Sequence, residues 1–322
     1  MISLFVILLI INVLYRSRGG YSSFSKDKAS FFKALLPFII IIHHSGFLYK
    51  EDFQMAGAFV VALFFFISGY GLESKRLLHR IRVQDLRIAL SKLLLPLVVP
   101  IIIYSLLKLL VYKIPLIDFL HNSFGSYQIV LPFTWFVLTL LILYAMFYIL
   151  ASVCDKLFAS ILISVIILAS AIAVLLHFGA IYHQSVLGFV AGVLYKDNED
   201  VVRNVLNREP QISNIFLIVL LCAVTLCCKH ILSNCEYPRV YVLSFIWPVL
   251  AVMLMGYVKP IESRVVNFFT GISYELYICQ GVAFLLMDGF MLPIWLNLIC
   301  VIALDVVIAY LSRLATKKIE AY

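Results

Sequence analysis

The sequence predicts an all-α fold, a polytopic transmembrane helical bundle of about 10 to 11 spans that forms a single domain over residues 1–322. Three observations support this: the composition, the recurrence of long apolar runs and the distribution of basic residues. Of the 322 residues, 64% are apolar and only 13% are charged, and the mean hydropathy is +1.06. A soluble domain is nearer half apolar and a quarter charged, so this chain needs the bilayer as its solvent.

Apolar runs long enough to cross a hydrocarbon core of about 30 Å locate the spans. The first run follows Met1 with no basic segment before it, which argues against a cleaved signal peptide. The first and seventh runs are shorter than the others. The predicted spans are residues 1–15, 31–49, 56–72, 91–112, 133–152, 158–178, 181–195, 213–233, 239–258, 266–287 and 290–311.

Basic residues gather in alternate loops, which orients the predicted spans. With the N-terminus outside, 20 of the 25 Lys and Arg residues fall on the cytoplasmic side. That bias is what the positive-inside rule predicts, and it puts the C-terminus in the cytoplasm. We therefore expect a multi-pass protein of the cell membrane, and we place it in the inner or plasma membrane of a bacterium. Because the charge forms no single patch, it does not predict nucleic-acid binding.

The seven cysteines do not predict a metal site or a disulfide framework. Their number is odd, most lie within apolar runs, and none forms a CxxC pair. Only Cys235, in a polar loop near Cys227 and Cys228, has a plausible disulfide partner. We therefore expect no metal and no tightly bound cofactor.

The second predicted span carries ionisable residues that a lipid-facing helix would not tolerate. His43 and His44 lie eleven residues or fewer after Lys33 in this span. Eleven residues are three helical turns plus about 20°, so Lys33 and His44 share a face, about 16 Å apart along the axis, whereas His43 is about 80° away. Pro37 would open the helix near that face. His44 is thus the candidate general base, and Lys33 a cation for an anionic ligand.

The third span ends in Phe65-Phe66-Ile67-Ser68-Gly69-Tyr70, whose small residues alone indicate only close helix packing. Together with Lys33-x10-His44, however, this segment resembles the integral-membrane acyltransferase family three, whose members acylate sugars and other small acceptors. Thr134-Trp135-Phe136-Val137-Leu138, followed by Tyr144, and Gly271-Ile272-Ser273-Tyr274-Glu275-Leu276-Tyr277 are similar to two further segments of that family. The resemblance covers residues 30–285.

The chain departs from the family pattern at several positions. Lys33 stands where the family usually has arginine, Gln280 where it often has histidine, and the span of Trp135 lacks a glutamate that many polysaccharide-modifying members carry. Lysine keeps the charge but loses the bidentate phosphate geometry of arginine.

The resemblance implies a membrane O-acyltransferase that moves an acetyl group from cytoplasmic acetyl-coenzyme A to a sugar or cell-surface glycan. His44 would act as the base or carry the acyl group. The basic residues between 75 and 92 would bind the phosphates of coenzyme A together with Lys33, and among them we single out Arg76 and Lys92. The predicted walls of the substrate channel are His43, Ser68, Tyr70, Trp135, Tyr144 and Tyr274.

Two other functions remain open on the sequence alone. A transporter or flippase for a lipid-linked sugar or a small acid would use the same buried ionisable residues as relays, but no matching halves are evident. A sensor or binding subunit could keep the scaffold without the chemistry. Stabilisation by coenzyme A would distinguish the enzyme from the transporter, and turnover would distinguish it from the sensor.

Overall fold

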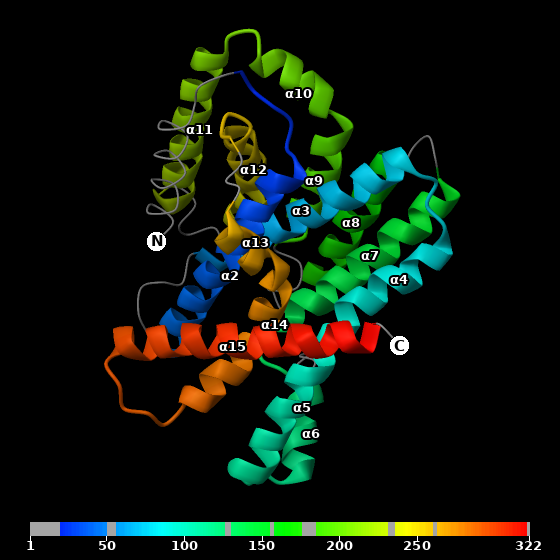
Figure 1. Ribbon diagram of the computed structural model, residues 1–322. Coiled ribbons are helices and arrows are strands. Elements are labelled where there is room, and N and C mark those ends of the chain that lie inside the picture. Colours follow the sequence, from blue (N-terminus) through cyan, green and yellow to red (C-terminus); the bar gives the residue numbers. More distant parts are fainter. Residues whose placement is uncertain are drawn as a thin grey trace.

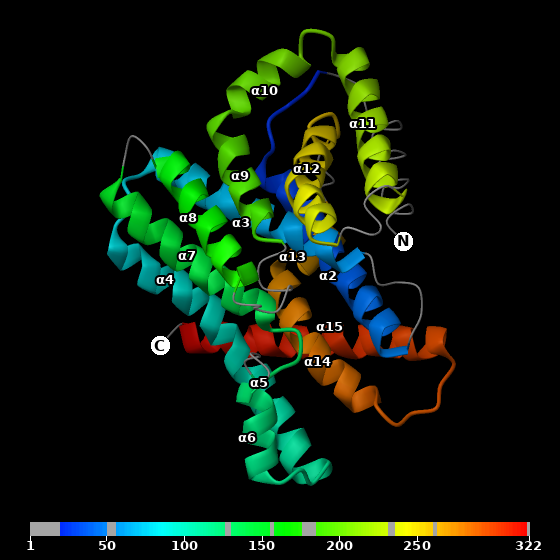
Figure 2. The same cartoon turned by 180° about the vertical axis from the view of Figure 1, so that it is seen from behind.

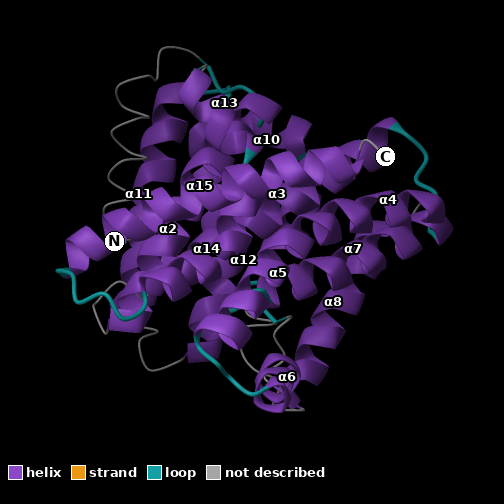
Figure 3. Cartoon of the chain, turned by 60° about the horizontal axis from the view of Figure 1, so that its bottom comes forward, coloured by secondary structure: helices purple, strands orange, loops and turns teal. Residues whose placement is uncertain are grey.

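The computed structural model describes residues 20–49, 56–125, 130–154, 158–175, 185–230, 236–259 and 263–320. Throughout these ranges the regular elements are helices, with no strand, which confirms the predicted all-α fold (Figures 1 and 3). The elements are α2 (Lys26–Tyr49), α3 (Ala56–Leu78), α4 (Val83–Leu94), η1 (Leu95–Leu97), α5 (Val98–Leu106), η2 (Leu107–Val111), α6 (Leu116–Gly125), α7 (Trp135–Val153), α8 (Phe158–Leu175), α9 (Leu187–Asp197), α10 (Glu199–Leu206), α11 (Pro210–His230), α12 (Glu236–Met255), α13 (Arg264–Gly271), α14 (Ser273–Met287) and α15 (Ile294–Glu320).

The helices account for the apolar runs of the sequence from residue 31 onward. Among the described residues, five helices are long and apolar enough to cross a membrane, and a bent helix pair makes up to six. The chain is therefore a multi-pass membrane protein. The predicted total of eleven spans stays a prediction, and the predicted span 1–15 lies outside the described residues. Figure 2 shows α11 and α12 on one side of α2 and α3, with α4, α7 and α8 on the other.

The predicted span 266–287 is not one straight helix. It divides into α13 and α14, which are bent by 65° at a break. Ile272 lies between them with φ −119° and ψ 11°, outside the helical range, so α14 starts a new hydrogen-bond ladder at Ser273. The first backbone N–H groups of α14 are consequently free of intrahelical partners, well inside the apolar stretch of the sequence. Thr270 fixes α13 to α2 by donating to the carbonyl of Ser30 at 2.8 Å.

Close packing of α3 against α9 forms the centre of the bundle. A Cβ added at Gly69 would meet the carbonyl oxygen of Phe189, and one added at Gly192 would meet that of Phe66. Gly188 contacts the backbone of Ala62 in the same way. The glycines of both helices therefore let two backbones meet where any side chain would hold them apart.

A buried polar network fastens residues 21–24 to the ends of α3, α9 and α10. The Glu199 carboxylate accepts from the backbone N–H of Phe24 at 2.9 Å and from the Tyr70 hydroxyl at 2.9 Å. The Tyr21 hydroxyl bonds that of Tyr195, and burial raises the pKa of Tyr21, which keeps it neutral. Lys28, the first-turn lysine of α2, bonds backbone carbonyls that include that of Gly256 at 3.1 Å. This network sets the position from which α2 enters the bundle.

Candidate active site

His44 lies near the C-terminal end of α2 and is buried, with 8% of its surface exposed. Its Nδ1 is 2.7 Å from Oε1 of Gln280 on α14. Its imidazole ring stacks on the ring of Phe133, with centroids 3.7 Å apart and planes 11° from parallel. Two segments distant from α2 in the sequence thus hold the ring, Gln280 at its edge and Phe133 at its face.

The orientation of the Gln280 amide decides which nitrogen of His44 carries the proton. Gln280 Nε2 donates to the carbonyl of Tyr277 at 2.6 Å. A carbonyl can only accept, so Nε2 must face Tyr277 and Oε1 must face His44. Because Oε1 also only accepts, Nδ1 of His44 carries the hydrogen in the neutral ring. The lone pair of Nε2 is then free to take a proton. Gln280 is fully buried, which holds this arrangement in place.

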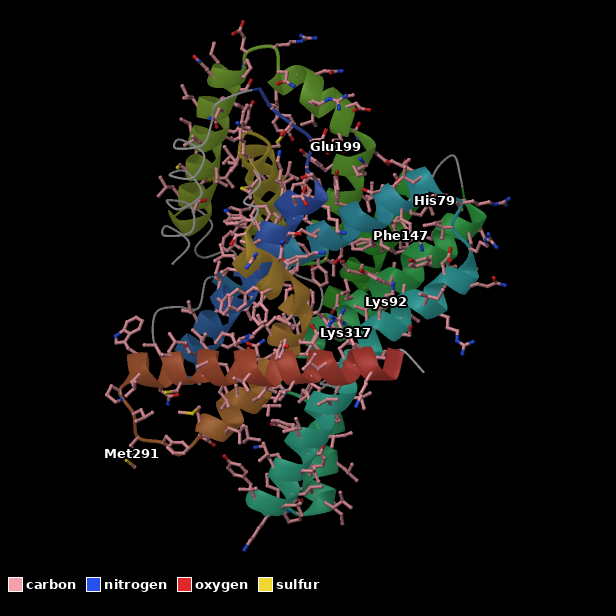
Figure 4. The ribbon with its side chains drawn as sticks, viewed as in Figure 1. His79, Lys92, Phe147, Glu199, Met291 and Lys317 are labelled. Atoms are coloured by element: carbon pink, nitrogen blue, oxygen red, sulfur yellow. The ribbon has the colours of Figure 1, made fainter. Side chains whose placement is uncertain are left out.

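A cavity of about 440 Å³ lies on the side of the bundle where α2 begins. We call it the basic cavity because three cationic side chains from three helices line it. They are Lys33 on α2, Lys92 on α4 and Arg313 on α15. Figure 4 shows Lys92 on α4, near the C-terminal end of α15. Bringing these charges together without a matching number of carboxylates favours an anionic ligand.

Arg313 is the member of this set that the sequence did not indicate. Its Nη1 is 3.3 Å from Oε1 of Glu275, whose side chain is buried at the start of α14. This single contact aims the guanidinium along the cavity wall and leaves further N–H groups on it for a ligand. The signal in the sequence was weak, because an arginine near the end of the last span also satisfies the positive-inside rule.

The start of α14 adds a second source of positive potential. Residues Gly271, Ser273 and Tyr274 line the basic cavity, and they flank the break at Ile272 where α14 begins. The free N–H groups of a first helical turn, with the positive end of the helix dipole, favour an anion. Helix break and side-chain charges therefore indicate the same kind of ligand.

The structure brings together several of the residues that the sequence singled out. Lys33, Lys92, Ser68, Tyr144 and Tyr274 all line the basic cavity. Because Tyr274 donates to the carbonyl of Leu93 at 2.7 Å, it also joins α14 to α4. His44 is not on the wall of this cavity. It is connected to it through Tyr277, which lines the cavity and accepts the Gln280 bond with its carbonyl.

Four predicted site residues lie elsewhere. Tyr70 points into the Glu199 network. Arg76 is held by Glu73 at 2.9 Å and stacks over the Phe158 ring, so it does not reach the cavity. Trp135 and His43 do not line the basic cavity either. The ring of His43 packs against Gly57 of α3. Tyr70 and Arg76 thus have partners away from the basic cavity, Glu199 and Glu73 respectively, and their predicted roles at the site stay predictions.

Comparison with known proteins adds the reaction class to this geometry. A family model described as an acyltransferase domain, the acyltransferase-3 model, matches residues 29–314. The chain belongs to this acyltransferase family. As a membrane acyltransferase, it transfers acyl groups other than aminoacyl groups. No curated protein and no solved structure matches it.

The matched range contains the main features of the candidate site. The match includes α2 with Lys33 and His44, the α13–α14 break, and α15 as far as Arg313. An acyl transfer needs a base for the acceptor and a holder for the donor. The His44–Gln280 pair and the basic cavity have the chemistry for these two tasks.

Proposed function

We propose that the protein is an O-acetyltransferase that moves an acetyl group from acetyl-coenzyme A to a hydroxyl of a sugar or cell-surface glycan. The observation that carries this proposal is the fixed tautomer of His44. The hydrogen bond from Nδ1 to Gln280 leaves a basic Nε2 within a buried site, as a general base requires.

The transfer then proceeds in balanced steps. Nε2 of His44 takes the proton of the acceptor hydroxyl as its oxygen attacks the thioester carbonyl carbon. A carbon–oxygen bond forms and the carbon–sulfur bond breaks, which releases coenzyme A as a thiolate. The proton on Nε2 passes to this sulfur, so that His44 returns to its starting state. A route through an acetyl-histidine is the alternative, in which Nε2 attacks the thioester first.

The basic cavity is the proposed site of the donor. Coenzyme A carries several phosphate charges on a long, flexible body, and three cations with a helix N-terminus suit those charges. In the proposed orientation this cavity opens towards the cytoplasm, because Lys92, Lys317 and Lys318 belong to the loops predicted to lie there. The pantetheine arm would extend past Tyr277 towards His44.

The first experiment compares two histidine variants in membranes supplied with radiolabelled acetyl-coenzyme A and the unacetylated glycan of a deletion strain. His44→Ala should lose at least about 100-fold in transfer, the usual scale of general base catalysis. His79→Ala is the matched control, because His79 is exposed beyond the end of α3 (Figure 4) and should keep full activity. Retained transfer in His44→Ala would refute the role of His44.

Thermal stability in detergent, together with turnover, distinguishes the proposed enzyme from a transporter and from a sensor. Coenzyme A should raise the unfolding temperature of both histidine variants, since the proposed donor site excludes His44 and His79. A transporter for sugars would show no such stabilisation. A sensor on the same scaffold would be stabilised but would transfer nothing.

A further inference from the structure

A second cavity, of about 260 Å³, lies at the other end of α14. We call it the aromatic cavity because three aromatic rings, of Tyr104, Phe133 and Phe284, form its walls. Among the described residues that line it, Asp288 is the one charged side chain, and Lys108 lies over the Tyr104 ring with its Nζ 5.7 Å from the ring centroid. Its remaining lining residues are Pro132, Gly281 and Leu285.

Three segments of the chain each pass from the wall of one cavity to the wall of the other. On α14, Ser273, Tyr274, Glu275 and Tyr277 line the basic cavity, whereas Gly281, Phe284 and Leu285 line the aromatic one, together with Asp288 just after the helix. Gln280, the partner of His44, is between them. A second segment passes from Lys92 and Pro96 at the basic cavity to Tyr104 at the aromatic one. The third passes the other way, from Phe133 at the aromatic cavity to Tyr144 at the basic one. His44 is therefore held at the level where one cavity gives way to the other.

Phe133 is shared between His44 and the aromatic cavity. The ring that forms part of the cavity wall is the same ring that stacks on the imidazole at 3.7 Å. Its backbone has φ 69°, a left-handed conformation that is unfavourable for an aromatic residue. The Tyr277 hydroxyl holds this conformation by donating to the Phe133 carbonyl at 3.0 Å. Strain of this kind is typical of sites where a side chain must be aimed precisely.

From this order we propose that the aromatic cavity binds the acceptor as a neutral sugar ring, an inference that rests on the acetyltransferase proposed above. Aromatic faces pack against the C–H face of a pyranose, and a carboxylate accepts hydrogen bonds from its hydroxyls. A volume of about 260 Å³ holds one ring of a longer glycan, whose free hydroxyl would reach Nε2 of His44 past the edge of Phe133.

The test uses the full-length enzyme in detergent, with acetyl-coenzyme A as donor and the unacetylated glycan of a deletion strain as acceptor. Asp288→Asn removes only the charge of an exposed side chain, so it should fold normally. We expect its KM for the glycan to rise about tenfold, the usual loss for one hydrogen bond to a charged group, with KM for acetyl-coenzyme A unchanged. Leu285→Trp, which fills the cavity, should have a larger effect of the same kind.

Lys92→Gln is the matched variant on the donor side. It should raise KM for acetyl-coenzyme A and leave KM for the glycan unchanged, since Lys92 lines the basic cavity and not the aromatic one. An unchanged glycan KM in both Asp288→Asn and Leu285→Trp would overturn the acceptor site, as would equal increases for both substrates. If the parent enzyme transfers no acetyl group at all, the proposed function fails instead. Inhibition by alkyl detergents that Leu285→Trp abolishes, without a glycan effect, would identify the cavity as a lipid site.

Discussion

The chemistry of the site depends on the position of a single proton on His44. A free histidine exchanges between two tautomers, and only the one with a bare Nε2 can act as the proposed base. Gln280 selects that tautomer because its own Nε2 is committed to the Tyr277 carbonyl at 2.6 Å. In the proposed mechanism, the residue that departs from the family pattern is therefore a positioning residue for the base.

Gln280→Leu removes the acceptor for Nδ1 while keeping the volume, so both tautomers become accessible and Nδ1 is left without a partner. We expect kcat to fall at least about tenfold with KM for acetyl-coenzyme A unchanged. Gln280→Glu supplies an oxygen acceptor for Nδ1, and its protonated carboxyl can also donate to the Tyr277 carbonyl, so it should recover most of the rate that the leucine variant loses. The rates are measured by release of the coenzyme A thiol. Equal rates in the leucine and parent enzymes would contradict a positioning role.

The face of a helix on which a residue lies could be predicted for some residues and not for others. The three-turn spacing of Lys33 and His44 could be read from the sequence. In the structure Lys33 lines the basic cavity, and His44, further along α2, is buried against Gln280. The spacing of Ser68 and Tyr70 was readable too. Side chains two positions apart on a helix point about 200° away from each other, so Ser68 and Tyr70 could not both line one channel. Ser68 faces the cavity and Tyr70 faces Glu199.

At the scale of the element, the contact of α3 with α9 depends on glycines rather than on large side chains. Gly69→Ala puts a methyl group into the backbone of Phe189, which cannot yield as a flexible side chain would. We expect a loss of about 3 kcal/mol or failure to fold, the upper part of the range for overpacking. Unfolding in detergent, followed by tryptophan fluorescence, measures the change.

Gly71→Ala is the matched control on the same helix. An added Cβ there meets nothing within 4 Å, so the substitution should leave the unfolding temperature unchanged or raise it slightly through helix propensity. Equal destabilisation by both substitutions would show that α3 tolerates no alanine for reasons other than its contact with α9.

The break between α13 and α14 shows what periodicity cannot reveal about an element. Residues 266–287 are continuously apolar enough to predict one span, yet Ile272 interrupts the helix and turns the start of α14 into a wall of the basic cavity. Hydropathy indicates that a segment lies in the membrane, whereas a break in its helix depends on how the segment packs against neighbours such as α2 and α15. For the same reason the pairing of His44 with Gln280, 236 residues apart, could not be predicted.

At the scale of the whole molecule, the ends of helices that the charge pattern assigns to the cytoplasm meet one another. Arg76 at the end of α3 is 3.7 Å from Asp197 at the end of α9, and Lys75 is 4.0 Å from Asp85 on α4. Arg313 on α15 reaches Glu275 at the start of α14. These ion pairs join neighbouring helix ends that the charge pattern puts on one side, and the alternation of sides itself stays a prediction.

The orientation itself leads to a prediction about the two ends of α15. Met291, fully exposed before the helix, should lie outside the cell, and Lys317, exposed near its end, should lie in the cytoplasm (Figure 4). In intact cells a membrane-impermeant maleimide should label Met291→Cys, whereas Lys317→Cys should react only after permeabilisation. The parent chain measures the background from its native cysteines. The reverse labelling would turn the basic cavity to the outside, where no acetyl-coenzyme A is available, and the proposed donor site would then be untenable even if the family and the fold stand.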